Sequence, residues 1–541
     1  MPARRSAVLL ALLTLSVSAI HAQQTLPHTP SERVTAAQFE AAKRSGIPTL
    51  RAFLERMPKG ADLHMHFSGA VYAESFLAQA ASSTDSLCID PIKLAFVKNA
   101  AASCPEGSVP AATAFKDQKL YDALVDSFSM RSFVPTPGVS GHDQFFATFA
   151  RFGGLGKSHA GEWLAEITSR AAAQNEQYLE IMHTPSFDHA AQLGYAAGWP
   201  AYSKAATTAD SSLPQQSSGS SPAELSALRE KLLAAGLRDD VATDRDEFAE
   251  ILAARARIQH CGTPAALPAC AVQVRFLFQV LRAFPPQQVF AQTLLAFEVA
   301  AADPNVVGLN FVQPEDAYLA MSEYHRQMLM LDYLHGVYPQ VHISLHAGEL
   351  APGLVPPAGL RFHMLEAVTL GHAERIGHGV DALYEPATLL PELARRHVMV
   401  EINLTSNEVI LGIDPAHHPL PAYRAARVPV ALSTDDEGVS RIDLTNEYTR
   451  AAVDFHLSYA QLKQMARTSL EHAFLPGASL WQHADDFSRI VAPCSMTVKP
   501  NPACTAFLAT SPRAAQQYEL ERRFRVFENS TTPDRKIKRT R

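Results

Sequence analysis

Eight short runs rich in β-branched, aliphatic and aromatic residues recur along the chain and predict eight β-strands. They span 61–67, 178–183, 272–280, 306–312, 340–347, 375–379, 398–404 and 428–435. Most of the intervals between them carry apolar residues at helical spacing, as in 286–302, 318–338 and 386–396. This alternation of strand and helix predicts an α/β fold with a parallel sheet.

The number of strands and the position of the polar residues favour a closed sheet. Histidine, aspartate or glutamate residues follow the first, fifth, sixth and eighth runs. An open, doubly wound sheet is the alternative, but closure into a (β/α)8 TIM-type barrel is what brings such separated strand ends around one pocket. We therefore predict a barrel over 57–476.

Two intervals are too long for ordinary crossover connections and predict insertions into the barrel. The first, about 81–134, follows strand one, and the second, about 187–246, follows strand two. Outside the barrel we expect an N-terminal helical extension over 23–56 and a C-terminal extension over 477–541.

Composition narrows the class of protein. Hydrophobic residues make up 47% of the 541 positions and charged residues 19%, which is typical of a globular chain with a large core. The formal net charge of -7 gives no broad electropositive surface. We therefore expect no nucleic-acid partner, because binding to a phosphate backbone depends on such a surface.

The first residues have the pattern of a secretory signal over 1–22. Arg4 and Arg5 precede an apolar stretch, and the small residues Ala19 and Ala22 offer cleavage sites. The stretch is shorter than the roughly 20 residues of a membrane-spanning helix, although an uncleaved anchor is an alternative. We expect export to the periplasm or the extracellular space, with no stable membrane insertion after cleavage.

Six cysteines fall into three neighbouring couples, Cys88 with Cys104, Cys261 with Cys270, and Cys494 with Cys504. Six cysteines permit 15 pairings. We propose the sequential one, which short loop closure and an oxidising compartment favour, with six free thiols as the alternative.

The candidate chemistry begins with His64 and His66. Alternate side chains of a strand share a face, so both imidazoles can point into the barrel mouth. Alone this pair is weak, because the chain has 22 histidines. With His346 and Asp435 at other strand ends, three imidazoles and one carboxylate suit Zn²⁺ and leave a coordination position for water.

Two further residues have the types that proton transfer requires. Glu349 follows His346 by three positions and can donate a proton, and His378, between Gly377 and Gly379, can orient a water and accept its proton. The structural alternatives are a helix-start carboxylate and a packed strand histidine. Asp436 points away from Asp435 in an extended chain, which separates a substrate-facing carboxylate from a metal ligand.

Taken together, the sequence segments that contain these residues resemble the adenosine deaminase family of metal-dependent amidohydrolases. The resemblance covers 57–476 and is carried by 57–59, 63–66, 346–349, 375–379 and 433–436. It implies one zinc ion at the positions of His64, His66, His346 and Asp435. It further implies that Glu349 protonates the purine ring nitrogen, that His378 handles the attacking water, and that Asp436 contacts the purine.

The function that this resemblance implies is hydrolytic deamination of adenosine or deoxyadenosine to inosine or deoxyinosine and ammonia, with a purine nucleoside as the small-molecule partner. Alternatives are a deaminase of another purine, such as adenine or a modified nucleoside, and a secreted nucleoside-binding protein with reduced catalysis. AMP calls for an Arg and Lys cluster that we do not find.

The secreted adenosine deaminase-related growth factors are the most similar branch, through 433–441, 444–448, 469–476 and the cysteine-containing first insertion. Ser68 stands where intracellular relatives carry a ribose-binding aspartate. After Gly308, which we expect at the substrate site, the glycine-containing substrate loop of the family is replaced by 313–316, Gln-Pro-Glu-Asp. The branch's dimer-forming N-terminal segment is not evident, so the sequence leaves the oligomeric state open.

Overall fold

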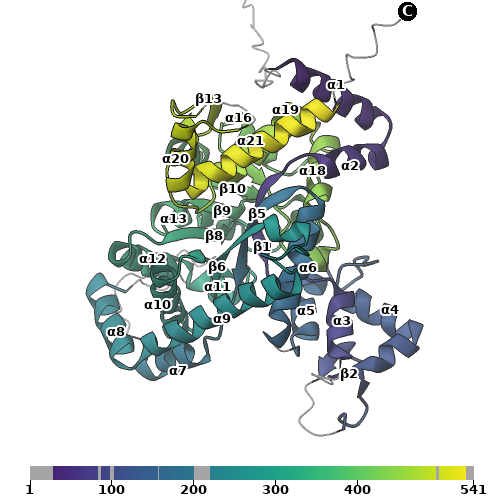
Figure 1. Ribbon diagram of the computed structural model, residues 1–541. Helices are drawn as coiled ribbons and strands as arrows, with labels where there is room; N and C mark the ends of the chain where they lie inside the picture. The colour runs from purple at the N-terminus through teal and green to yellow at the C-terminus, as the bar shows by residue number, and fades with distance from the viewer. Residues whose placement is uncertain are drawn as a thin grey trace, which may run out of the picture.

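A barrel of eight parallel strands forms the centre of the computed structural model (Figure 1). The structure describes residues 29–82, 87–97, 103–155, 157–199, 220–494 and 499–531, so the expected signal peptide lies outside the described residues. The strand order is β1-β5-β6-β7-β8-β9-β10-β11. The strands are β1 (Gly60–His66), β5 (Glu176–His183), β6 (Gln273–Leu281), β7 (Val306–Val312), β8 (His342–Ala347), β9 (Arg375–His378), β10 (Met399–Ile402) and β11 (Val430–Leu432).

The barrel closes between its first and last strands through a short seam. Met65 forms a parallel bridge with Asp435. The amide of Asp435 donates to the carbonyl oxygen of His64 over 2.9 Å, and the amide of His66 donates to the carbonyl oxygen of Asp435 over 3.2 Å. The predicted (β/α)8 barrel is confirmed, and its closing seam consists of candidate site residues.

The strands are apolar because they are buried on both faces; all eight residues of β5 are buried. Helices cover the outside of the barrel and begin at recognisable caps, such as the capping boxes of Ser140 in α5 and Ser458 in α19. The covering helices are α3 (Ala73–Ala80), α5 (Gly141–Phe152), α6 (Ala160–Ala173), α9 (Leu237–Ile258), α10 (Pro286–Ala302), α11 (Tyr318–Ser322), α12 (Tyr324–Val337), α13 (His363–Thr369), α14 (Leu389–Arg396), α15 (Leu404–Leu411), α16 (Leu420–Ala425), α17 (Glu437–Ser440), α18 (Leu444–Val453) and α19 (Tyr459–Glu471).

The two long intervals contain secondary structure of their own. The first holds an antiparallel sheet, β2 (Cys88–Asp90), β3 (Ala95–Val97) and β4 (Val109–Pro110), and the helix α4 (Gln118–Ser127). With α3 these elements project from the barrel as a lobe, at the lower right of Figure 1. The second is helical, with α7 (Asp188–Ala197), α8 (Pro222–Ala234) and the first turns of α9.

The chain's two extensions meet at the other end of the molecule. The helices α1 (Pro30–Arg44) and α2 (Ile47–Arg56) lie beside the long C-terminal helix α21 (Pro512–Thr531), drawn in yellow in Figure 1. Between α19 and α21 lie the hairpin β12 (Trp481–His483) and β13 (Asp486–Ile490) and the helix α20 (Pro502–Thr510). Buried Lys463 joins the extensions, because its Nζ donates to Glu32 over 3.2 Å and to Glu528 over 2.6 Å.

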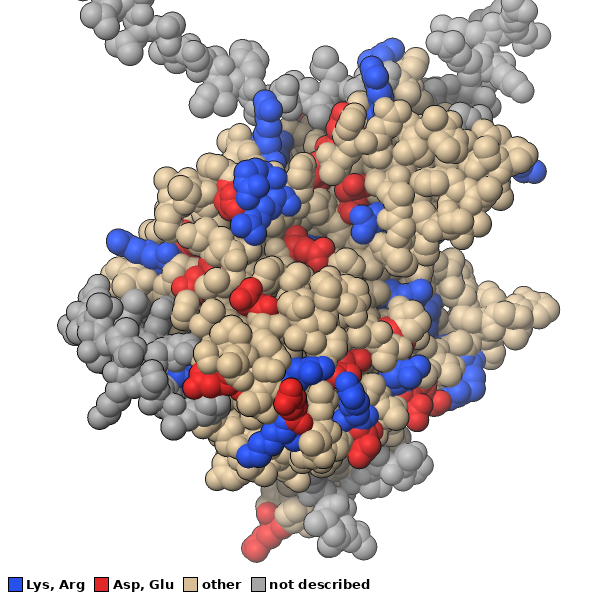
Figure 2. Space-filling view, turned by 90° about the vertical axis from the view of Figure 1, so that its left-hand side faces the viewer, with Lys and Arg blue, Asp and Glu red and all other residues tan. Residues whose placement is uncertain are grey.

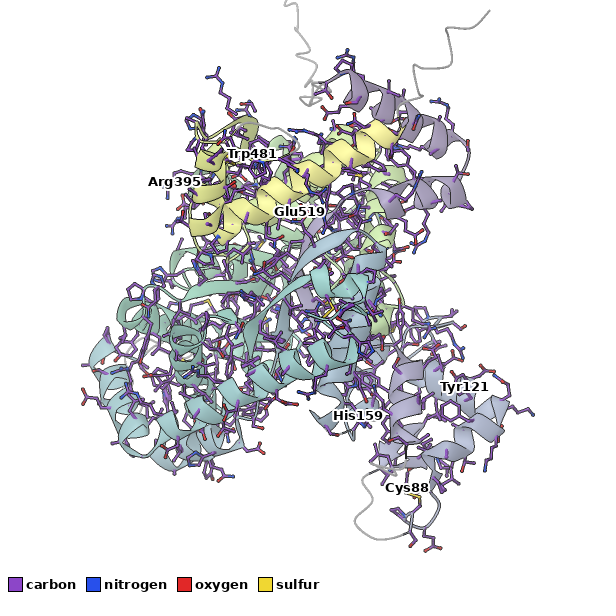
Figure 3. The ribbon with its side chains drawn as sticks, in the orientation of Figure 1. Cys88, Tyr121, His159, Arg395, Trp481 and Glu519 are labelled. Carbon is purple, nitrogen blue, oxygen red and sulfur yellow. A yellow bond between two sulfur atoms is a disulfide. The ribbon has the colours of Figure 1, made fainter. Side chains whose placement is uncertain are left out.

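All six cysteines form disulfides, and the pairing is the sequential one that we proposed: Cys88–Cys104, Cys261–Cys270 and Cys494–Cys504. Cys88 lies in the projecting lobe (Figure 3). On the face shown in Figure 2, basic and acidic side chains are interspersed. None of the helices within the described ranges combines the length and apolar character that a membrane crossing needs.

Candidate metal centre

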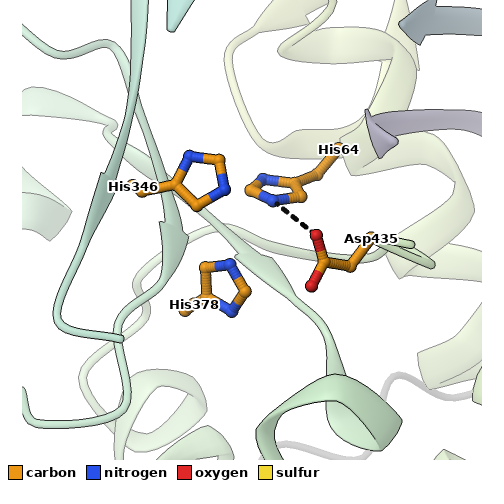
Figure 4. A group of neighbouring side chains, drawn as sticks. All are labelled: His64, His346, His378 and Asp435. Atoms are coloured by element: carbon orange, nitrogen blue, oxygen red, sulfur yellow. Dashed lines mark ion pairs between the residues drawn. The ribbon is translucent and has the colours of Figure 1, made fainter. Parts of the chain in front are cut away.

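Three strand ends bring the four predicted ligands together. His64 and His66 lie at the end of β1, His346 in β8, and Asp435 just after β11. Nε2 of His66 lies 3.2 Å from Nε2 of His346 and 3.1 Å from Oδ1 of Asp435, and Nε2 of His64 lies 3.4 Å from the same oxygen. Figure 4 shows His64, His346 and Asp435 pointing toward one another.

The hydrogen bonds at the far side of each ring show that the converging nitrogens carry lone pairs. Nδ1 of His64 donates to the carboxylate of Glu401 over 2.6 Å. Nδ1 of His346 donates to Oδ1 of Asn310 over 2.8 Å, and that oxygen also accepts the backbone amide of His346. In its neutral form each of these imidazoles carries its one hydrogen on Nδ1, which leaves a lone pair on Nε2 that can bind a metal.

Lone pairs that face one another in a buried site repel unless a cation lies between them. Nε2 of His64 and Oδ1 of Asp435 are buried without a hydrogen-bond partner among the described residues. Nδ1 of His66 lies 3.0 Å from the side-chain oxygen of Gln279, which places the hydrogen of a neutral ring on Nδ1 and a lone pair on Nε2. Imidazole nitrogens and a carboxylate oxygen are the donor set of Zn²⁺ in catalytic sites, so these residues fit the predicted ion.

His378 makes the choice of ligands ambiguous on distance alone. Ligand atoms of His64, His346, His378 and Asp435 lie within 4.8 Å of one another (Figure 4). A second group, His66 with Asp435 and Asp436, meets the same criterion. The two groups share Asp435, so either His66 or His378 completes a set of four.

The backbone at this centre is strained where side chains converge. His378 has φ of 70° and Asp435 has φ of 61°, both in the left-handed region that costs a non-glycine residue about 1–3 kcal/mol. A Cβ at Gly377 would lie 2.4 Å from Cε1 of His64, and one at Gly69 would lie 1.4 Å from Oδ1 of Asp436. Both glycines are therefore required for these close approaches.

Glu349 is buried beside the cluster. Burial, together with the nearby charges of Asp435 and Glu315, raises its pKa well above the usual range. Its Oε1 lies 3.6 Å from Nδ1 of His378. Glu315 fixes the position of this segment, because its carboxylate accepts the backbone amides of Gly348 over 3.1 Å and Glu349 over 2.7 Å. A raised pKa favours the protonated carboxyl, which is the form that can donate a proton.

The three residues predicted to contact the substrate lie in different parts of the barrel. Asp436 is buried, and burial raises its pKa to about 7. Ser68 is half-buried in the turn after β1. Gly308 lies near the start of β7, where a Cβ would meet the carbonyl oxygen of His342 at 2.6 Å and the ring of Phe474 at 3.1 Å. It belongs to the barrel wall near the opposite end of the strand, so the structure does not bring it to the cluster.

Gln313 keeps a glycine-like backbone in the loop after β7. Its φ is 88°. Its side-chain oxygen accepts the amide of Ala283 over 2.8 Å, and its carbonyl oxygen accepts Nε of Arg282 over 3.4 Å. These contacts hold a conformation that the sequence alone would assign to glycine.

The sequence analysis missed the polar residues that orient the ring and carboxylate ligands. They are Gln279, Asn310, Glu401 and Ser406, whose Oγ donates to Oδ2 of Asp435 over 2.6 Å. Asn310 and Glu401 are each the one polar residue of a short apolar strand, and this is a signal that could have found them, because a buried polar group needs a partner.

Comparison with known proteins agrees with these observations. The adenosine deaminase family model matches residues 247–485. An adenosine deaminase of Escherichia coli O1:K1 / APEC is 38% identical over 135 residues, which are 25% of this chain and 38% of that protein. The chain thus matches well under half of the length of such curated relatives.

Two solved structures are similar over most of their length. The N6-mAMP deaminase of Arabidopsis is 18% identical with a TM-score of 0.48, covering 78% of this chain and 95% of that one. The adenine deaminase of Arthrobacter aurescens is 15% identical with a TM-score of 0.47, covering 77% and 94%. Residues 247–485 therefore resemble the adenosine deaminase family, and bacterial adenosine deaminases are similar to a part of this chain.

Proposed function

We propose that this protein is an exported, zinc-dependent deaminase that converts adenosine or deoxyadenosine and water into inosine or deoxyinosine and ammonia. The observation that carries the proposal is the convergence of the histidine Nε2 atoms and the Asp435 carboxylate beside Glu349, whose pKa burial raises. Zinc, when bound by His64, His66, His346 and Asp435, supplies a water that is acidic enough to attack at neutral pH.

The other residues act on the purine. Glu349, whose pKa burial raises, would protonate a ring nitrogen as the water attacks C6. Asp436 would contact the purine, and His378 would orient the water. Of the two protons of the water, one would pass to the amino group, which leaves as ammonia when the C6–N bond breaks, and the other would restore the Glu349 carboxyl and leave a carbonyl group at C6.

The charged residues near the site support a nucleoside or base over a nucleotide. Two arginines are already paired with carboxylates: Arg170 in α6 pairs with Glu437 at 2.8 Å, and Arg441 after α17 pairs with Glu74 at 2.8 Å. A phosphate group would need free donors of this kind.

Export is part of the proposal. The N-terminal pattern over 1–22 and the three disulfides support an oxidising destination, the periplasm or the extracellular space. We further propose the domain limits given above, with the catalytic barrel over 57–476.

Absorbance assays on zinc-loaded protein test the function. Adenosine and deoxyadenosine should lose their characteristic band, with adenine and AMP as the other members of the panel. Glu349→Gln should abolish turnover and keep full zinc content, Asp435→Ala should lower zinc content, and Glu392→Gln on the surface of α14 should change neither. The proposal fails if the zinc-loaded wild type leaves adenosine and deoxyadenosine unchanged.

A further inference from the structure

A chain of buried side chains runs from His378 away from the metal centre. The structure places Oδ1 of Asn407 3.0 Å from Nδ1 of His378 and Nδ2 of the same amide 2.9 Å from Nε2 of His418. The backbone amide of Leu420 donates to Nδ1 of His418 over 3.1 Å. All three side chains are buried, with exposed fractions of 0%, 0% and 5% for His378, Asn407 and His418.

The hydrogen bond from Leu420 to His418 fixes which atoms donate and which accept in the other two hydrogen bonds. A backbone N–H can only donate, so Nδ1 of His418 accepts and the ring hydrogen is on Nε2. That hydrogen is donated to the amide oxygen of Asn407. The amide of Asn407 must therefore be turned by half a turn from its placement in the structure, and its nitrogen then faces His378 and donates to Nδ1.

The reverse direction fails on hydrogen count. If the oxygen of Asn407 faced His378, its nitrogen would donate to Nε2 of His418, and both nitrogens of that neutral ring would have to accept. A neutral imidazole has one lone pair available in its plane for this purpose. A half-turn of the amide exchanges its oxygen and nitrogen without changing the space it fills, so the neighbours alone decide its orientation.

Two more observations agree with this direction. Nδ2 of Asn403 lies 3.4 Å from Nδ1 of His378, so a second amide can donate to the same nitrogen. Burial lowers the pKa of His418 to about 3, so its ring is neutral near pH 7, as the hydrogen count requires.

We propose that His418 is a positioning residue that, through Asn407, holds His378 as the tautomer with its hydrogen on Nε2. This is the opposite of His64 and His346, whose hydrogens are on Nδ1. The proposal rests on the proposed function for its catalytic meaning. Nothing in the hydrogen count itself depends on that function.

Two consequences follow for the centre. A nitrogen that carries a hydrogen has no lone pair for a metal, so His378 is excluded as a ligand and His66 completes the set with His64, His346 and Asp435. Nε2 of His378, which has no hydrogen-bond partner among the described residues, donates to the attacking water and orients it. In this tautomer that nitrogen does not take the water's proton, so the proposal differs from the proton-acceptor role expected from the sequence.

The isosteric change Asn407→Asp gives the sharpest test, because a carboxylate only accepts and forces the hydrogen of His378 onto Nδ1. The readout is the ring ¹⁵N spectrum of histidine-labelled, zinc-loaded protein, with the His378 signals assigned by their loss in His378→Gln. We expect Nε2 protonated in the wild type and Nδ1 protonated in Asn407→Asp. We also expect kcat to fall by about 10²–10⁴-fold, as when a wrong tautomer is imposed on a catalytic histidine, with a smaller change in KM.

Variants of His418 supply the matched comparison. His418→Phe removes the group that selects the amide orientation and should lower kcat and mix the two His378 tautomers. His418→Gln offers an acceptor and a donor in one side chain and should restore both properties, while His417→Gln, at the exposed neighbouring histidine, should match the wild type. Melting temperature and zinc content identify any variant that fails to fold.

Each result decides the proposal. An unprotonated Nε2 on His378 in the wild type overturns it, as does a His378 spectrum in Asn407→Asp or in His418→Phe that equals the wild-type spectrum. The spectra are recorded without substrate. An inactive wild type with the expected tautomer would therefore contradict the proposed function and leave this inference standing.

Discussion

Replacing Gly377 by alanine should expel the metal by displacing one ligand. Gly377 lies in β9, opposite His346 in β8, and a Cβ there would be 2.4 Å from Cε1 and 2.7 Å from Nδ1 of His64. Ordinary contact begins near 3.4 Å, so the ring must move by about 1 Å. Zinc sites tolerate deviations of only about 0.2 Å in their bonds, and His64 is also held by Glu401.

The expected magnitude follows from these distances. Changes to outer partners of a metal ligand cost about 10–100-fold in affinity, and moving a ligand itself should cost at least about 100-fold. The added methyl group should also lower the free energy of unfolding by about 1–3 kcal/mol, the usual range for overpacking.

The assay is zinc titration against a competing chelator, with unfolding followed in parallel. Gly336→Ala is the matched control, because a Cβ there meets no atom within 4 Å and α12 gains about 1 kcal/mol from the better helix former. Wild-type zinc affinity in folded Gly377→Ala would refute the placement of His64 at the metal.

Three further predictions test other parts of the site and fold. Glu401→Gln removes the charged acceptor of His64 and should lower zinc affinity about 10–100-fold, measured by the same titration. Gly69→Ala should displace Asp436, raising KM or abolishing turnover while zinc content stays at the wild-type level. Burial opposes ionisation of Glu521, but the charge of Arg467 outweighs burial and lowers the pKa of this carboxyl below its usual 4.5. The stability that this ion pair contributes is present above pH 4.5 and is lost as the pH falls further. The free energy of unfolding in urea should therefore differ less between Glu521→Gln and the wild type at pH 3 than at pH 6.

The strands could be predicted because burial on both faces leaves a continuous apolar signal. The run 306–312 coincides with β7, and 286–302 coincides with α10. The last run was expected to reach residue 435, but β11 ends at Leu432. Asp435 adopts φ of 61°, which a pattern of polar and apolar residues cannot show.

The metal ligands could also be predicted, because histidine and aspartate residues occur in the sequence at the ends of the predicted strands. Their partners could not, since Gln279 and Asn310 are polar residues whose role appears only when strands far apart in sequence become neighbours. The sheet in the first insertion escaped prediction because its strands are only two or three residues long. The tautomer of His378 depends on Leu420, which no sequence motif connects to it.

Anomalous X-ray diffraction at the zinc edge, on crystals of the zinc-loaded protein, tests the central claim most directly. The account predicts one strong peak about 2.0–2.2 Å from Nε2 of His64, His66 and His346 and from Oδ1 of Asp435. A peak that is bonded to His378 in place of His66, or no peak among these residues, would contradict it.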